Sequence, residues 1–286
     1  MAVELNYVAI CRNNQIFILD GLSTDEYQTG RKLHEDIVDY GRTIGRLNHC
    51  SHFKIKSKTA LVAYLKAMET ECKAGVLMPA LHFECHGDED KGLWLAGSGE
   101  FIPWPELASL IAPLNAASRN NLSVMLATCH GYKLAKGVNV KTPCPFHFMI
   151  APNEEISAGL IYDSVLPFYK EVISTGELNT ALGHLDSKFK RFIAGEWFYT
   201  MVASFFTNNY GAKARASMVE EMVDNEVRNA GYHNRQLVRA SRARAKKHLA
   251  NPQNFYNDLC RSFFHGQIQV PYEEMKKFVD YHKSIR

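Results

Sequence analysis

The chain has 286 residues, 46% of them hydrophobic, which is enough for one large globular domain or two ordinary ones, each with a core. Its formal net charge of +3 is too small to indicate a protein built mainly to bind nucleic acid. Seven scattered cysteines without a Cys-x-x-Cys pair, no signal-peptide pattern and no apolar run near the roughly 20 residues of a membrane span predict a reduced, cytoplasmic protein without a zinc module.

The first elements are predicted from apolar runs and turn residues. Tyr7–Cys11 and Gln15–Asp20 flank Arg12-Asn13-Asn14, which predicts a hairpin. Apolar periodicity then predicts a helix over 33–44, a strand over 52–56, a helix over 59–75, a strand over 77–85, a hairpin over 93–102, a helix from residue 105, and strands over 122–129 and 146–151.

The later part of the chain reads as helical. Helices are expected over 164–173 and 178–193, and beyond about residue 200 over 212–230, 235–250, 252–264 and 271–285. Strands that alternate with helices predict an α/β domain over 1–200, with a mainly parallel sheet flanked by helices. A helical C-terminal extension over 201–286 follows.

Two of the predicted strands end alike. ALHFECHG over 80–87 stops at His86-Gly87, and LSVMLATCHG over 122–131 delivers Cys129 at its end. In an open parallel sheet the functional crevice lies beyond the carboxyl ends of the strands, so a thiol and an imidazole are expected to meet there. A thiol is nucleophilic as its thiolate, and a neighbouring imidazole takes its proton. We therefore predict a His86–Cys129 dyad, with the N–H groups of Gly87 and Cys129 as donors to an acyl oxygen.

These side chains also have structural interpretations. A cysteine at the end of a strand is often a small buried hydrophobe, and a single histidine is often a satisfied core or surface residue. Adjacent strand residues point to opposite faces, so Cys85 is expected to face away from His86. No closely spaced ligand pair supports a metal site, and no metal or cofactor is predicted, although nearby side chains could be imagined as ligands: Cys85, His86, Cys129, His130, His82 and His147.

The blocks that end at His86-Gly87 and Cys129 are joined by HGDEDKGLWLAGSGEFIPWPELASLIAPLN, which contains a Gly-Leu-x-Leu step, a hairpin, a tryptophan and a helix. FYKEVISTGELNTALGHL over 168–185 follows as helix, glycine and helix. Over roughly residues 75–190 the chain resembles the caspase-like cysteine peptidases (clan CD), and most closely their prokaryotic CHAT domains.

This resemblance implies an endopeptidase with Cys129 as nucleophile, His86 as general acid and base, and an acyl-enzyme intermediate. It also implies a specific protein substrate, such as a pore-forming protein, toxin or regulator encoded nearby, in a bacterial defence or cell-death pathway. Family members that select basic side chains carry an acidic residue two positions before the cysteine, where this chain has Ala127. The Gln-Ala-Cys motif of caspases is also absent. Asp88 and Ala127 are the pocket candidates, and a solvated turn is the alternative for the acidic run 88–90.

A predicted helix near the C-terminus carries the basic residues Arg235, Arg239, Arg242, Arg244, Lys246 and Lys247. One interpretation is a phosphate-binding surface formed by Arg235, Arg239, Arg242 and Lys246. The other is an ordinary solvated helix face that pairs with acidic residues of the preceding helix. The function is therefore expected to be a cysteine peptidase, with a catalytically silent caspase-like scaffold and a nucleotide- or nucleic-acid-responsive module as alternatives.

Overall fold

The computed structural model describes residues 10–284. It divides into two compact units. The sheet unit comprises residues 10–139 and Pro143–Ala194. The helical unit comprises Val140–Thr142 and the chain from Gly195 onward. No helix within residues 10–284 combines the length and apolarity needed to cross a membrane.

The sheet unit alternates strands and helices along the chain. Its elements are β1 (Gln15–Asp20), α1 (Thr29–Thr43), β2 (Cys50–Lys54), α2 (Lys58–Lys73), β3 (Pro79–Glu84), β4 (His86–Asp88), β5 (Gly92–Leu95), β6 (Glu100–Ile102), α3 (Trp104–Ala117), β7 (Ser123–Ala127), the 3-10 helix η1 (Gly131–Gly137), β8 (Phe148–Pro152), α4 (Ala158–Thr175), α5 (Leu178–Leu182) and β9 (Phe189–Ile193).

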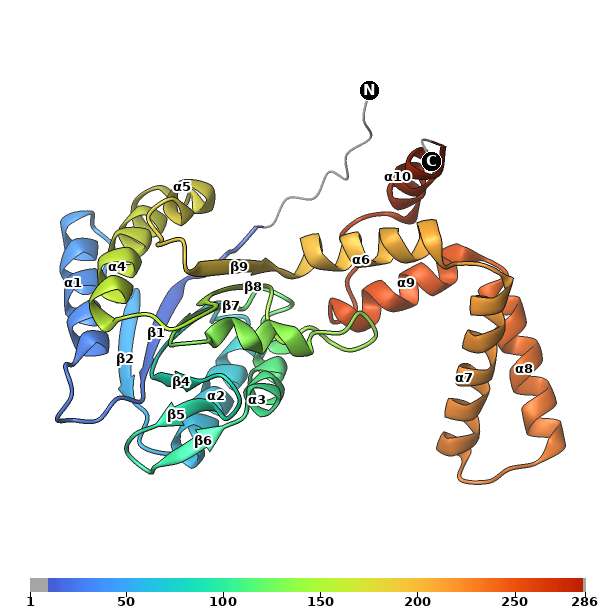
Figure 1. The fold of residues 1–286 in the computed structure, drawn as a ribbon, viewed down its shortest axis with the longest axis horizontal. Coiled ribbons are helices and arrows are strands. Elements are labelled where there is room, and N and C mark those ends of the chain that lie inside the picture. Colours follow the sequence, from blue (N-terminus) through green and yellow to red (C-terminus); the bar gives the residue numbers. More distant parts are fainter. Residues whose placement is uncertain (1–9, 285–286) are drawn as a thin grey trace. The chain divides into compact units, whose positions relative to one another are not determined.

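Six strands form the main sheet in the order β2-β1-β3-β7-β8-β9 (Figure 1). The first five are parallel, and β9 pairs antiparallel with β8 at the edge. A second sheet contains β4, β5 and β6. The predicted fold class, a mainly parallel sheet flanked by helices with a helical C-terminal part, is therefore confirmed.

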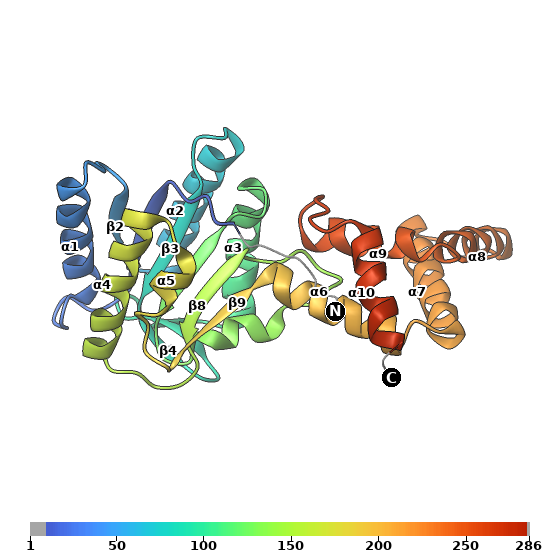
Figure 2. The same ribbon diagram turned by 90° about the horizontal axis from the view of Figure 1, so that it is seen from above.

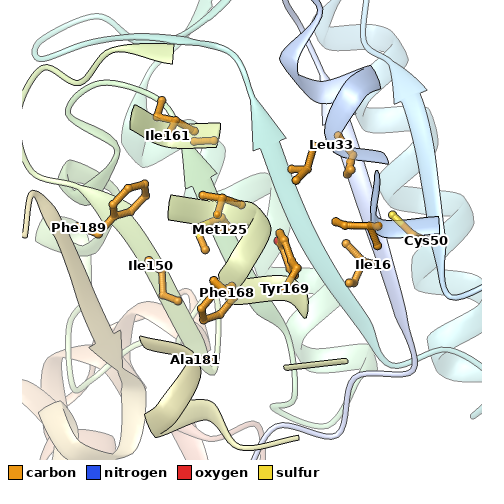
Figure 3. Packing of buried hydrophobic residues seen from close by; sticks show 14 of the residues in the cluster. Ile16, Leu33, Cys50, Met125, Ile150, Ile161, Phe168, Tyr169, Ala181 and Phe189 are labelled. Atoms are coloured by element: carbon orange, nitrogen blue, oxygen red, sulfur yellow. The ribbon is translucent and has the colours of Figure 1, made fainter. Parts of the chain in front are cut away.

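Helices cover both faces of the main sheet. Seen from above, α1 and α4 lie together on one side, and α2 and α3 lie on the other (Figure 2). Buried side chains of the strands meet those of α1 and α4 in one cluster (Figure 3). It includes Ile16, Ile18, Leu33, Ile37, Met125, Ile150, Ile161, Val165 and Phe168. A sheet covered on both faces explains why its strands read as continuous apolar runs.

Two sequence predictions in this unit are wrong. Gln15–Asp20 is not part of a hairpin, because β1 has parallel neighbours on both sides. The part of the predicted partner before Ile10 lies outside the described residues. The predicted helix over 178–193 is instead the short α5 followed by β9. Within β9, Phe189 and Phe192 are buried while Lys190 and Arg191 are exposed, and pairing with β8 overrides local helix propensity.

The helical unit contains α6 (Ala194–Asn208), which begins at the last residue of the sheet unit, and then α7 (Ala212–Ala230), α8 (Arg235–Leu249), α9 (Pro252–Phe263) and α10 (Tyr272–Ser284). Its core is aromatic, because Phe198, Tyr199, Phe263 and Phe264 are all buried and pack against one another in edge-to-face or tilted pairs. The α7–α8 hairpin has a small core of its own around Val219, Ala245 and Leu249.

Candidate active site

The predicted site residues follow the carboxyl ends of two neighbouring strands. Asp20, Glu84 and Ala127 are the last residues of β1, β3 and β7, and they form one row across the sheet. His86 and Cys129 lie two residues beyond Glu84 and Ala127 in their own segments. The parallel register thus carries both segments past the same edge of the sheet, where the sequence predicted the site.

Gly87 lies directly against the backbone of Cys129. A Cβ atom built on Gly87 would lie 2.1 Å from the carbonyl oxygen of Cys129 and 2.4 Å from Oγ1 of Thr128. Only a residue without a side chain fits at such a separation. The sequence predicts that Gly87 follows the end of a strand. Instead, Gly87 lies within β4 and is the register partner of Leu93. The predicted roles of the Gly87 and Cys129 N–H groups remain predictions.

The His86 side chain is held by a residue that the sequence reasoning missed. Its Nε2 lies 2.5 Å from Oε1 of Glu26, which belongs to the loop between β1 and α1. The imidazole side chain is 54% exposed and the Glu26 side chain 35% exposed. Partial burial works to raise the pKa of Glu26, but hydrogen bonds from the Ser23 N–H and from His86 hold it below its ordinary value.

The Cys129 thiol contacts the main chain of Ile156, in the loop after β8. Its Sγ lies 3.6 Å from the Ile156 carbonyl oxygen and accepts a hydrogen bond from the Ile156 N–H at 3.5 Å. No hydrogen bond within residues 10–284 joins this thiol to the His86 imidazole. The two segments therefore meet at Gly87, while the two side chains engage separate partners.

Cys129 and Cys11 are more exposed than the other five cysteines, and all seven lie in the described part of the chain. Only Cys11 and Cys129 are partly exposed, and burial raises the pKa of Cys11. Burial raises the pKa of the Cys50, Cys144 and Cys260 thiols to about 12 and that of Cys72 to about 11. Cys85 is buried, with Sγ 3.9 Å from the Leu19 carbonyl oxygen, and burial raises its pKa as well.

A buried polar network lies at the ends of β1 and β3. Asp20 accepts hydrogen bonds from Lys54 Nζ at 3.0 Å and from the Leu22 N–H at 3.0 Å, and its second oxygen lies 3.0 Å from His52 Nε2. Burial works to raise the pKa of Asp20, but the bonds from His52 and Lys54 outweigh it and leave that pKa below its ordinary value. Asp20 is therefore a paired anion in the protein interior.

Glu84 has partners of its own in this network. One carboxylate oxygen accepts a hydrogen bond from the Thr29 hydroxyl, and the other lies 2.8 Å from His82 Nε2. The second nitrogen of His82 lies 3.1 Å from the Tyr169 hydroxyl. Gly30, in the first turn of α1, packs closely on both Asp20 and Glu84. The network joins strand ends to the start of α1 and fixes where the Glu26 loop begins and ends.

The two pocket candidates differ in burial and in hydrogen bonding. Asp88 Oδ1 accepts the N–H groups of Asp90 and Lys91 at 3.0 and 2.9 Å, and these bonds lower the Asp88 pKa. The carboxylate thus closes a turn. Ala127 is buried in the main core cluster. Among residues 10–284, no group of three or more His, Cys, Asp or Glu side chains could hold a metal ion.

In the helical unit, two residues of the basic run pair with α7. Arg242 binds both carboxylate oxygens of Glu220, at 2.9 and 2.6 Å, and Arg244 binds Glu226. Acidic partners on the preceding helix are what the interpretation of the basic run as a solvated helix face predicts.

Neither a scan against models of known protein families nor a search of curated protein sequences finds a match for this chain. The resemblance to caspase-like peptidases therefore depends on the motifs alone.

Proposed function

We propose that the chain is a caspase-like cysteine endopeptidase in which Cys129 is the nucleophile and His86 the general acid and base. The observation that carries this proposal is the contact between Gly87 and the Cys129 backbone, which brings the two motif segments together at the carboxyl edge of a parallel sheet. Active sites of open α/β folds occupy this edge.

The chemistry follows from these two side chains. The imidazole takes the thiol proton, the thiolate attacks the peptide carbonyl, and the imidazolium protonates the leaving amine. Water then hydrolyses the acyl-enzyme. The present partner of the thiol is no obstacle, because sulfur forms only weak hydrogen bonds and those to Ile156 are 3.5 and 3.6 Å long. Rotation of the Cys129 side chain releases them.

The residue preference at the cleaved bond is not a simple charge preference. The acidic side chains nearest the strand ends, Asp20 and Glu84, already have internal partners, and Asp88 closes a turn. Ala127 contributes no charge. The uncharged residue at 127 and the missing Gln-Ala-Cys motif support a site that strictly requires neither a basic nor an acidic side chain in its substrate.

A thiol-reactive peptide probe tests the assignment. We expect labelling of the wild-type chain at Cys129, loss of labelling in Cys129→Ala, and strongly slowed labelling in His86→Ala. Cys11→Ala is the matched control, since Cys11 is the other partly exposed cysteine, and it should label normally. Labelling that persists in Cys129→Ala, or an unreactive Cys129 in a folded wild-type protein, overturns the proposal and leaves the silent scaffold.

The substrate is proposed to be one protein, such as a pore-forming protein, toxin or regulator encoded beside this chain. Incubation with such neighbours should give fragments with wild type and none with Cys129→Ala. The ion pairs of Arg242 and Arg244 favour a structural role for the basic run over a nucleic-acid surface. A gel shift that weakens steeply with salt would instead support nucleic-acid binding.

A further inference from the structure

The loop between β1 and α1 brings the Glu26 carboxylate against the His86 imidazole. An exposed ion pair between two mobile side chains usually contributes little to stability, because both side chains lose conformational entropy when they pair. Here both carboxylate oxygens of Glu26 have a defined partner. Oε1 lies 2.5 Å from His86 Nε2, and Oε2 accepts the Ser23 N–H at 2.6 Å.

The loop that carries Glu26 is braced internally. The Gln28 side-chain amide donates to the carbonyl oxygens of Ser23 at 2.6 Å and of Glu26 at 2.8 Å. Lys54 Nζ in turn donates to the Gln28 side-chain oxygen at 3.1 Å. The first two bonds lie within the loop and the third ties it to β2, so together they limit the positions that the Glu26 carboxylate can take.

The loop is also anchored at both ends on β3. The Gly21 N–H donates to the Glu84 carbonyl oxygen at 2.9 Å, and the Thr29 hydroxyl donates to the Glu84 carboxylate. Glu84 precedes His86 by two residues in the same segment. The loop and the imidazole that it holds are therefore fixed to one strand end.

The contact selects one nitrogen of the imidazole. A neutral imidazole carries a single ring proton, and a carboxylate accepts it. With Nε2–H donated to Glu26, Nδ1 is the nitrogen that can accept another proton. A fixed tautomer and ring orientation are what a nucleophile's base requires from a third group.

We propose, on the basis of the peptidase function above, that Glu26 is the positioning residue that holds His86 with Nδ1 as its basic nitrogen. The thiol proton of Cys129 passes to Nδ1, the Nε2 proton stays bonded to Glu26, and the imidazolium so formed lies beside a carboxylate. As sulfur bonds to the acyl carbon and the C–N bond breaks, the Nδ1 proton goes to the departing amine. Glu26 neither gains nor loses a proton.

The opposite role for this contact would be a latch. Glu26 would then hold the imidazole away from Cys129, and its removal would raise reactivity. The contact engages Nε2 and leaves Nδ1 for the thiol, which the positioning role requires. The two roles predict changes of opposite sign.

Glu26→Gln in the full-length chain is the test, with Glu35→Gln as matched control. Glu35 is an exposed carboxylate on α1 that pairs with Arg31 at 2.9 Å, away from the motifs. The first measurement is the ¹⁵N chemical shifts of the histidine rings, assigned with His86→Gln. We expect the Nε2-protonated tautomer of His86 in wild type and Glu35→Gln, and a mixture of tautomers in Glu26→Gln.

The second measurement is the rate of Cys129 alkylation by iodoacetamide against pH. At pH 7, Glu26→Gln should react at least about tenfold more slowly than wild type, because the neutral amide leaves the imidazolium without its counter-charge. The difference should shrink at high pH, where hydroxide removes the thiol proton without the imidazole. Glu35→Gln should match wild type throughout.

Unchanged His86 shifts together with an unchanged alkylation rate in Glu26→Gln would overturn the positioning role, and faster alkylation would replace it with a latch. If Cys129 is unreactive even in wild type, the peptidase function fails separately. The ring-nitrogen shifts then decide the Glu26 inference alone, since they require no cleavage.

Discussion

At the scale of single residues, Gly87 sets how closely the His86 and Cys129 segments approach. Gly87→Ala would force a methyl group against the Cys129 carbonyl oxygen and Thr128 Oγ1. The Thr128 side chain can rotate away, but the carbonyl oxygen belongs to the backbone and moves only with the segment that follows β7. We expect a loss of about 1–3 kcal/mol in the free energy of unfolding and slower labelling of Cys129. Urea denaturation and the peptide probe measure the two effects.

The control for this substitution is Gly137→Ala. Gly137 ends η1, and a Cβ there would meet no atom within 4 Å. If Gly87→Ala proves as stable and as reactive as Gly137→Ala, the two motif segments do not pack together as proposed.

A second residue, His147, makes the stability depend on pH. Its ring is buried, Nδ1 lies 3.3 Å from the Asn120 side-chain nitrogen, and Nε2 has no partner among the described residues. Burial lowers the pKa of His147 from 6.5 to about 4. The unfolded chain therefore binds a proton first as the pH falls, and stability is lost from about pH 6.5 down to about pH 4.

Because the pKa of His147 falls from 6.5 in the unfolded chain to about 4 in the folded protein, the free energy of unfolding should decrease by about 3 kcal/mol over that pH range. His147→Asn keeps an acceptor near the Nδ1 position and removes the titration. Its free energy of unfolding, measured by urea denaturation at several pH values, should fall less steeply between pH 6.5 and 4 than that of wild type. Parallel curves for the two proteins would mean that protonation of His147 does not destabilise the folded protein.

At the scale of elements, apolar runs predicted most of the sheet but not its pairing. Such runs located β1, β3, β7 and β8, because a sheet covered on both faces needs continuous apolar strands. They could not reveal that β1 lies between two strands distant in the chain, since register is a tertiary property. Nor did they reveal β9, a half-exposed edge strand with the weak pattern FKRFI.

The site was predictable to a similar extent. His86-Gly87 was predicted because an apolar run ends there in a polar residue and a glycine. Asp20-Gly21 at the end of β1 has the same pattern, so the sequence also indicated the buried network around Asp20, although it was not predicted. Glu26 had none. It lies in a polar loop, and only the folding of that loop onto β3 brings its carboxylate to His86.

Helix α4 carries two glycines for which we predict opposite effects. Gly159 lies in its first turn with open space around its Cα, so Gly159→Ala should stabilise the protein by about 0.4–1 kcal/mol by restricting the unfolded chain. Gly176 caps the helix at φ +74, where an alanine is strained, so Gly176→Ala should destabilise by about 1–2 kcal/mol. Urea denaturation of both variants measures these changes, and shifts of equal sign would refute the α4 boundaries.

At the scale of the whole molecule, each unit of the described chain has a buried cluster made of its own residues. The cluster beneath α1 and α4 lies within the sheet unit, and the ring cluster around Phe264 lies within the helical unit. Each of these clusters is buried within a single unit. A mutation in one core should therefore act on the unit that contains it.

Phe264→Ala and Phe83→Ala form a reciprocal pair for this prediction. Phe264 is fully buried against Phe198, Tyr199 and Phe263, and Phe83 of β3 is 1% exposed, so each truncation should remove about 3–5 kcal/mol from its own unit.

Trp197, stacked on Phe263, reports on the helical unit, while the sheet unit has Trp94 and Trp104. Fluorotryptophan ¹⁹F spectra recorded through a urea titration resolve the three reporters. We expect Phe264→Ala to lower the unfolding midpoint of Trp197 alone, and Phe83→Ala to lower those of Trp94 and Trp104 alone. Midpoints that move together in both variants would mean that the two cores unfold as one cooperative body.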